Sequence, residues 1–250
     1  MSLNSSKSTA PRSFKPANLF QVVGLLAWVL LSFFTAQFVV VLGAGLLSGA
    51  LGFEISLDSA ATQFTLTALI YTLTLVFVLG GSILIKQTVS RRELGVSKAI
   101  NWLDLGLAPA AFIVYMIIST GAVLLLSQLV PGFEVDQAQQ VGFDNLVGRF
   151  DLLMAFIALV IIAPIAEEVL LRGYLYGKLR SHASVLAATL LTSALFGAVH
   201  MQWNVAIDTF ILSLAMCYLR ELTGTIWAGT LVHMIKNGLA FTLIFIVQVV

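Results

Sequence analysis

Charged residues are scarce in this sequence. They make up 10% of its 250 residues, while hydrophobic residues make up 59%. A soluble globular domain has roughly 45–50% apolar and about 25% charged residues. The composition therefore excludes an ordinary soluble domain and predicts a protein that crosses a membrane several times. Basic residues outnumber acidic ones by 13 to 12, and no basic run is longer than Arg91-Arg92, so nucleic-acid binding is not expected.

Cysteine is nearly absent as well. Cys217 is the single cysteine, which excludes an intrachain disulfide and a thiolate metal cluster. Because Cys217 lies among apolar residues, we expect it to be buried as a small hydrophobic side chain.

Long apolar runs are the main feature that is present. A spanning helix needs about 20 apolar residues. The runs predict an all-α protein, a multi-span transmembrane helix bundle of about seven helices. The fifth and sixth runs are short and close together, which predicts a tight helical pair. The candidate spans are residues 19–48, 63–85, 105–130, 151–179, 183–200, 205–220 and 224–249.

Charges outside the runs predict an orientation. Residues 1–18 are polar and carry basic but no acidic residues, which predicts a disordered cytoplasmic tail. Basic and acidic connections then alternate along the chain. Lysine and arginine favour the cytoplasmic side, so we predict a cytoplasmic N-terminus and an external C-terminus. The basic connections are 86–104 and 172–182, and the acidic ones are 49–62 and 131–150.

Three polar clusters remain inside the predicted helices: EEVLLR at 167–172, FGAVH at 196–200 and HMIKN at 233–237. A charged side chain at mid-membrane costs at least roughly 2.5–3.5 kcal/mol, so such residues usually face a bundle interior and pair with one another. Singly, the acids would be read as helix-end charges and each histidine as a packing residue. Three clusters on three late helices favour a site.

The spacing within the first cluster predicts an ion pair. Glu168 and Arg172 are four residues apart and share a helix face. Glu167 is rotated from Glu168 by about 100°. We therefore expect that the two acids do not share a partner, and that one is free for chemistry while the other pairs with Arg172. Pro164 lies one turn earlier and predicts a kink that aims the acids and admits water.

Two acids, two imidazoles and an amide suit hydrolysis by activated water, with a carboxylate as general base and a histidine–asparagine pair stabilising an oxyanion. Alternatively, Glu167, His200 and His233 would bind a divalent metal such as Zn²⁺ with one open position. The sequence has no G-x-S-x-G serine, no H-E-x-x-H motif and no second pair of membrane aspartates. These absences argue against three other kinds of membrane protease.

The three clusters, in this order and at this approximate spacing, resemble the EExxxR, FxxxH and HxxxN motifs of one family. It is the CAAX prenyl protease and bacteriocin-processing family (CPBP, or Abi) of intramembrane proteases. The resemblance covers about residues 150–245. It implies a catalytic helix bundle at 150–250. Composition and the apolar runs predict the other two parts, a cytoplasmic tail at 1–18 and three N-terminal helices with their loops at 19–149.

The resemblance also implies a role for each polar residue. The family is described both as metalloproteases and as metal-free glutamate proteases, so a divalent metal held by Glu167, His200 and His233 stays open. The implied roles are Glu167 as the base that activates water, His200 as its partner, Glu168 as a supporting acid held by Arg172, His233 and Asn237 as the oxyanion pair, and Phe196 as part of the wall.

The expected protein is an intramembrane endopeptidase of a bacterial cell membrane. Its partners would be the lipid bilayer and a peptide or protein substrate, lipidated or bacteriocin-like. We expect Glu167 and His200 to lie within roughly 3–6 Å of each other. An alternative is a non-catalytic immunity or scaffold protein of the same fold, which needs none of these residues. A transporter would show repeated halves, and none is seen.

Overall fold

The structure, a computed structural model, describes residues 19–52, 54–84, 88–133, 135 and 141–247. These residues form seven continuous helical segments and contain no strand, which confirms the predicted all-α class. The predicted tail, residues 1–18, lies outside them. The segments are α1 (Leu19–Leu51), α2 (Ala60–Leu84), α3 (Trp102–Leu129), the run Arg149–Arg180, α7 (Val185–Ala198), α8 (Trp203–Thr223) and the run Trp227–Val247, which contains α9 (Trp227–Phe241) and η3 (Thr242–Val247).

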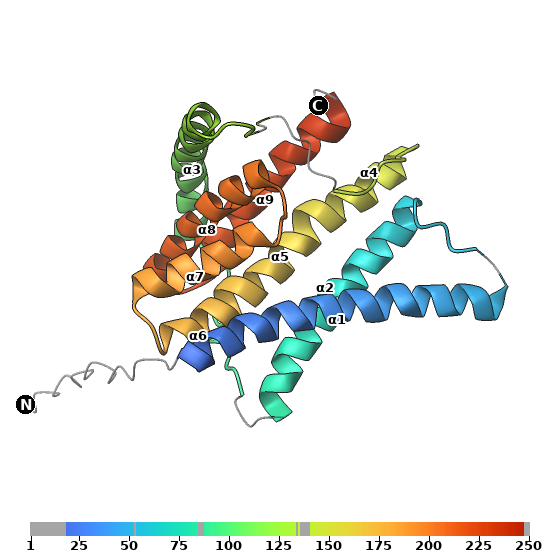
Figure 1. Cartoon of the computed structure of the whole chain (residues 1–250), viewed down its shortest axis with the longest axis horizontal. Helices are drawn as coiled ribbons and strands as arrows, with labels where there is room; N and C mark the ends of the chain where they lie inside the picture. The colour runs from blue at the N-terminus through green and yellow to red at the C-terminus, as the bar shows by residue number, and fades with distance from the viewer. Residues whose placement is uncertain (1–18, 53, 85–87, 134, 136–140, 248–250) are drawn as a thin grey trace, which may run out of the picture.

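Five of the described segments are long and apolar enough to cross a membrane: α1, α2, α3, the Arg149–Arg180 run and the Trp227–Val247 run. The chain is therefore an integral, multi-pass membrane protein. The segment α7 is shorter and α8 carries Asp208, Arg220 and Glu221, so the fifth and sixth predicted spans are not among these five. Figure 1 shows α7 and α8 side by side, and the two helices contact each other closely.

The Arg149–Arg180 run passes through the middle of the bundle (Figure 1). It contacts α1 and α2 on one side and α7, α8 and α9 on the other. Its residues are the most buried of the five candidate spans. Two charged residues in the middle of this run, Glu168 and Arg172, are thus fully buried.

The same run is not a uniform α-helix. Two π-helical stretches flank the short α-helix that carries Pro164 and both acids. Proline lacks an N–H and its ring crowds the preceding turn, and a π stretch widens the helix at that point. Stretches of this kind occur frequently at functional sites. In order, the run comprises α4 (Arg149–Phe156), η1 (Ile157–Ile162), α5 (Ala163–Glu168), η2 (Val169–Leu175) and α6 (Tyr176–Arg180).

Four basic residues lie together at one end of the bundle, called here the basic end: Arg92, Lys178, Arg180 and Arg220. Arg220 of α8 donates to the carbonyl of Glu93 (2.9 Å), and the N–H of Ile226 donates to the carbonyl of Gly95 (3.1 Å). These bonds join the connection between α2 and α3 to the link between α8 and α9. The start of α1 and the end of the Trp227–Val247 run lie on opposite sides of the bundle in Figure 1. The membrane face on which the basic end lies stays a prediction.

A continuous apolar core joins the later helices. Its fully buried members include Tyr115 of α3, Leu175 of the central run, and Leu212 and Met216 of α8. Cys217 is buried in the same core, as its apolar context predicted.

Candidate active site

Glu168 and Arg172 form the predicted ion pair. Arg172 Nη1 lies 2.7 Å from Glu168 Oε1, and both side chains are 0% exposed. The guanidinium carbon stands 4.8 Å from the centre of the Phe196 ring, a cation–π contact that suits a desolvated arginine. Through its contact with Phe196, the pair links the central run to α7 and gives the rest of the site a rigid support.

His233 bridges the two acids. Its Nδ1 donates to Glu168 Oε1 at 3.1 Å, while its Nε2 lies 3.7 Å from Glu167 Oε2. The expectation that the acids share no partner is therefore wrong. The helical rotation separates the carboxylates as expected, but an imidazole has nitrogens on two sides and contacts both.

Glu167 is the acid that faces open space. Its side chain is 22% exposed, against 0% for Glu168. The hydroxyl of Tyr71 in α2 donates a hydrogen bond to Glu167 Oε1. Tyr71 was not predicted, because no spacing in the sequence connects a tyrosine of the second helix with position 167. The sequence feature that could have identified Tyr71 is its polar hydroxyl group inside an otherwise apolar span.

His200 is oriented by its own helix. Its Nδ1 lies 2.7 Å from the carbonyl oxygen of Phe196. A carbonyl only accepts, so Nδ1 carries the hydrogen and, in a neutral ring, Nε2 is left with a lone pair. The Phe196 ring meets His200 edge-on at 5.1 Å and His233 at 5.6 Å. Phe196 thus packs against both imidazoles and the guanidinium of Arg172.

Asn237 is placed by a backbone carbonyl. Its Nδ2 donates to the oxygen of Leu159 at 2.9 Å. That carbonyl lacks its usual helical donors, because the N–H of Ala163 bonds to Ala158 and Pro164 has no N–H. The proline therefore creates the acceptor that orients Asn237, and one N–H of the amide stays available.

A cavity of about 230 Å³ brings the predicted residues together. Glu167, His200, His233 and Asn237 all line it, and Glu168 and Arg172 lie behind them in the core. A second cavity of about 250 Å³ reaches the same point from α1 and is lined in part by Tyr71, Glu167 and His200. The expected 3–6 Å separation of Glu167 and His200 stays a prediction.

A comparison with protein families matches part of the chain. Residues 149–239 match the family described as Type II CAAX prenyl endopeptidase Rce1-like. They are an Rce1-like domain. The match begins with α4 and ends within α9, so it contains all three polar clusters, and it confirms the resemblance seen in the sequence. No curated protein and no solved structure matches the chain.

The Rce1-like domain receives part of its site from elsewhere in the chain. Tyr71 of α2 lines both cavities, and Val29, Leu30 and Phe33 of α1 line the second. The N-terminal helices therefore complete the site and cover one side of it.

A lysine adds positive charge to the first cavity. Lys236 lines the cavity, and its Nζ lies 3.9 Å from Asp208 Oδ2. Asp208 Oδ1 accepts hydrogen bonds of 2.5 Å from both Tyr115 and Ser119 of α3. Asp208 thus anchors α8 to α3 beside the site of the Rce1-like domain.

The candidate metal ligands are Glu167, His200 and His233. Within the described ranges, no three histidine, cysteine, aspartate or glutamate side chains are arranged to hold a metal ion. One nitrogen of His200 and one of His233 already bond to Phe196 and Glu168. These bonds use only Nδ1 of each ring and are of the kind that orients metal-bound histidines. Glu167, His200 and His233 line one cavity, and a divalent metal held by them stays a prediction.

Proposed function

We propose that this protein is an intramembrane endopeptidase that hydrolyses a peptide bond of a membrane-associated substrate with water activated by Glu167. The observation that carries the proposal is the single cavity lined by Glu167, His200, His233 and Asn237. The Rce1-like domain is of the CAAX-protease type, and its polar residues supply the groups that hydrolysis requires.

Water activation is assigned to Glu167. Its partial exposure and its place on the cavity make it the carboxylate that a water molecule reaches. The Tyr71 hydroxyl occupies Oε1, which leaves Oε2 as the atom that takes a proton. His200 Nε2 accepts the second hydrogen of the same water and so orients its oxygen for attack.

Charge on the carbonyl oxygen is stabilised from α9. When water adds to the peptide carbonyl, its oxygen becomes an oxyanion. Asn237 has one N–H free after bonding Leu159 and donates it to this oxygen. His233, whose Nδ1 is fixed by Glu168, presents Nε2 to the cavity and supports the oxyanion when protonated.

The tetrahedral intermediate then collapses, and the proton taken from water passes to the leaving amine. The oxyanion re-forms the carbonyl, the carbon–nitrogen bond breaks, and protonated Glu167 gives its proton to the leaving amine. The products are a carboxylic acid and an amine, which become a carboxylate and an ammonium ion when the acid's proton passes to the amine, and Glu167 returns to its starting form. Every step assigned here uses only side chains of this chain.

The substrate proposed here is a peptide or protein held at the bilayer, either lipidated or bacteriocin-like, in a bacterial cell membrane. Both cavities reach Glu167 between membrane helices. A substrate must therefore be embedded in the membrane or bound at its surface to reach the base.

The experiment is a cleavage screen with protein purified in detergent. Membrane-associated peptides are incubated with the wild type, with Glu167→Gln and with Glu54→Gln, a control acid that is exposed far from the site. Glu167→Gln keeps the side-chain size but cannot take a proton, so cleavage should fall about 10²- to 10⁴-fold. Glu54→Gln should cleave at the wild-type rate.

Two further results would change the assignment. Full activity of Glu167→Gln would remove the base from the mechanism and favour the non-catalytic immunity or scaffold alternative. Stoichiometric metal in the purified protein, together with loss of cleavage after chelation and recovery on adding Zn²⁺, would replace the metal-free mechanism with a metal-assisted one.

A further inference from the structure

A further cavity lies away from the candidate active site. It has a volume of about 1030 Å³ and opens between the connection from α2 to α3, the end of the central run, and the end of α8. It does not share a residue with the two cavities around Glu167. The proposed hydrolysis makes no use of it.

The lining of this cavity carries excess positive charge. It contains four cationic side chains and two acidic ones. Arg180 forms an ion pair with Glu221 through hydrogen bonds of 2.8 and 3.4 Å. The Tyr176 hydroxyl donates to the same carboxylate at 3.0 Å. The cationic side chains are Arg92, Lys178, Arg180 and Arg220, and the acidic ones are Glu93 and Glu221.

Within the described residues, three of the four lining cations form no ion pair, because only Arg180 does so, with Glu221. Arg92 and Lys178 form no ion pair within the part of the chain that the structure describes. The second acid, Glu93, accepts from the backbone N–H and the hydroxyl of Ser90 at 2.7 and 2.9 Å. The excess positive charge therefore lies on the group formed by Arg92, Lys178 and Arg220.

Arg220, the third cation without an ion pair, is held in place by contacts with the backbone. Its Nη2 donates to the Glu93 carbonyl, while its buried Nε makes no hydrogen bond within the described residues. The guanidinium lies flat against Gly95, where an added Cβ would come within 2.7 Å of Arg220 Cζ. Gly95 also has a φ of +71°, so glycine is needed there for two reasons. The result is a fixed guanidinium with an unused donor.

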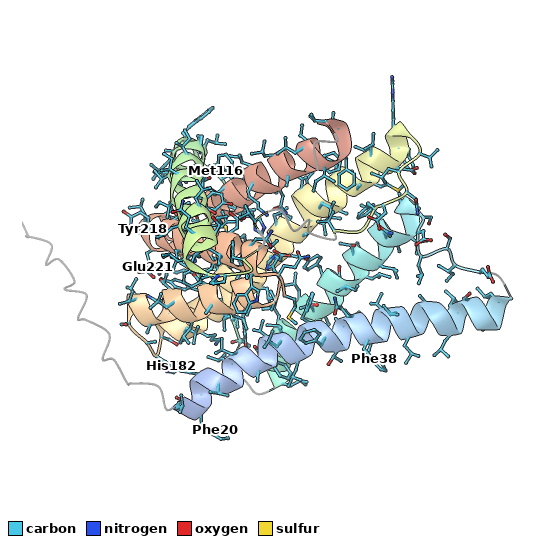
Figure 2. The ribbon with its side chains drawn as sticks, turned by 45° about the horizontal axis from the view of Figure 1, so that its top comes forward. Phe20, Phe38, Met116, His182, Tyr218 and Glu221 are labelled. Carbon is cyan, nitrogen blue, oxygen red and sulfur yellow. The ribbon has the colours of Figure 1, made fainter. Side chains whose placement is uncertain are left out.

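Exposed aromatic residues favour a membrane interface at this end of the bundle. Exposed aromatic side chains surround this end of the bundle: Trp102 is 88% exposed and Tyr218 is 67% exposed. The Trp227 ring donates its N–H to the carbonyl of Lys98. Tryptophan and tyrosine gather where the hydrocarbon meets water. Figure 2 shows Tyr218 next to Glu221 at this end of the molecule.

We propose that this basic cavity binds the phosphate of an anionic phospholipid headgroup, with Arg92, Lys178 and Arg220 as the phosphate-binding residues. Basic pockets between membrane helices at this depth suit anionic headgroups. Arginine provides donors in a fixed fork, and lysine acts as a mobile point charge. The exposed Tyr218 and Leu222 beside the cavity offer a surface for the acyl chains.

The test measures lipid binding and does not depend on proteolysis. Wild-type protein, Arg92→Gln/Lys178→Gln and Arg91→Gln are purified and titrated with phosphatidylglycerol, phosphatidylcholine and inorganic phosphate. Arg91 is the matched control, since it neighbours Arg92 but does not line the cavity. We expect the wild type and Arg91→Gln to prefer phosphatidylglycerol over phosphatidylcholine. The double variant should bind phosphatidylglycerol at least about tenfold more weakly than the wild type does.

The outcomes separate the two sources of phosphate. If inorganic phosphate at low millimolar concentration displaces phosphatidylglycerol, the phosphate site stands but a free anion is its ligand. Equal binding of both lipids by the wild type, or an unchanged preference in the double variant, overturns the proposal. If the double variant unfolds, Arg92→Lys/Lys178→Arg retains the charge and should retain the preference.

Discussion

The Tyr71 hydroxyl donates a hydrogen bond to Glu167 across 96 positions of sequence. This bond connects α2, outside the Rce1-like domain, with the acid assigned as the base. It occupies one carboxylate oxygen and leaves the other toward His233. Tyr71 is thus a positioning residue whose removal should affect catalysis more than folding.

Tyr71→Phe tests this relationship. A hydrogen bond to a charged group contributes about 1.5–3 kcal/mol, so kcat should fall roughly 10- to 100-fold while KM changes little. Tyr115→Phe is the matched control, because Tyr115 donates to a carboxylate that lies outside the proposed chemistry. A Tyr71→Phe enzyme that cleaves as fast as the control would show that the bond does not orient the base.

Arg172→Met should destabilise the protein. It leaves Glu168 charged and buried without its ion-pair partner, which costs about 3–5 kcal/mol. The melting temperature in detergent should fall well below that of Glu167→Gln and of Arg149→Met, which removes an exposed arginine.

A second variant separates loss of the pair from loss of packing. Glu168→Gln/Arg172→Met removes both charges, so it should melt above Arg172→Met alone. If the double variant melts lower than the single one, the arginine acts through its contact with Phe196 and not through the ion pair.

Pro164→Ala should impair catalysis through Asn237. The alanine supplies an N–H that can bond to the carbonyl of Leu159, and this bond would release Asn237 from its position. Loss of one oxyanion donor lowers kcat by up to about 10²- to 10³-fold, so a decrease of about tenfold or more is expected. Pro109→Ala is the control, since Pro109 lies inside α3 away from the site. Equal kcat values for the two variants would contradict the assigned role of Pro164.

Gly197→Ala should separate α7 from α8. The added Cβ would lie 2.6 Å from the carbonyl oxygen of Ala206, and backbone atoms cannot move aside cheaply. We expect a loss of about 1–3 kcal/mol. Gly121→Ala in α3 meets no atom within 4 Å and should be neutral or slightly stabilising. Thermal unfolding in detergent checks both, and similar melting temperatures would argue against a tight contact at Gly197.

The sequence predicted the parts of this protein that depend on local spacing. Apolar runs identified the helical segments, and the four-residue spacing identified the pairing of Glu168 with Arg172. Burial of Cys217 followed from its neighbours. Each of these depends only on residues within a few helical turns.

Contacts between distant helices were not predictable in the same way. Nothing in the sequence connects Tyr71 with Glu167, or Asp208 with Tyr115, because these pairs are set by how the helices pack. The bridging position of His233 was missed for a related reason. Helical rotation describes where the two acids point, but not how a ring from another helix fits between them.

The π stretches on either side of α5 have a consequence for how this chain tolerates change in length. A π stretch differs from an α-helix by one extra residue in the turn, and one residue corresponds to a rotation of about 100°. In η1 the N–H of Ala163 bonds to the carbonyl of Ala158, five residues earlier. Deleting one residue between them would turn this into a regular α bond and leave Glu167 and Glu168 facing His233. All the letters of the EEVLLR motif would still be present. A deletion from a regular α stretch of the same run, such as α4, would instead rotate both acids by about 100° away from His233. The run therefore tolerates the loss of one residue at a π stretch, but not elsewhere before the acids.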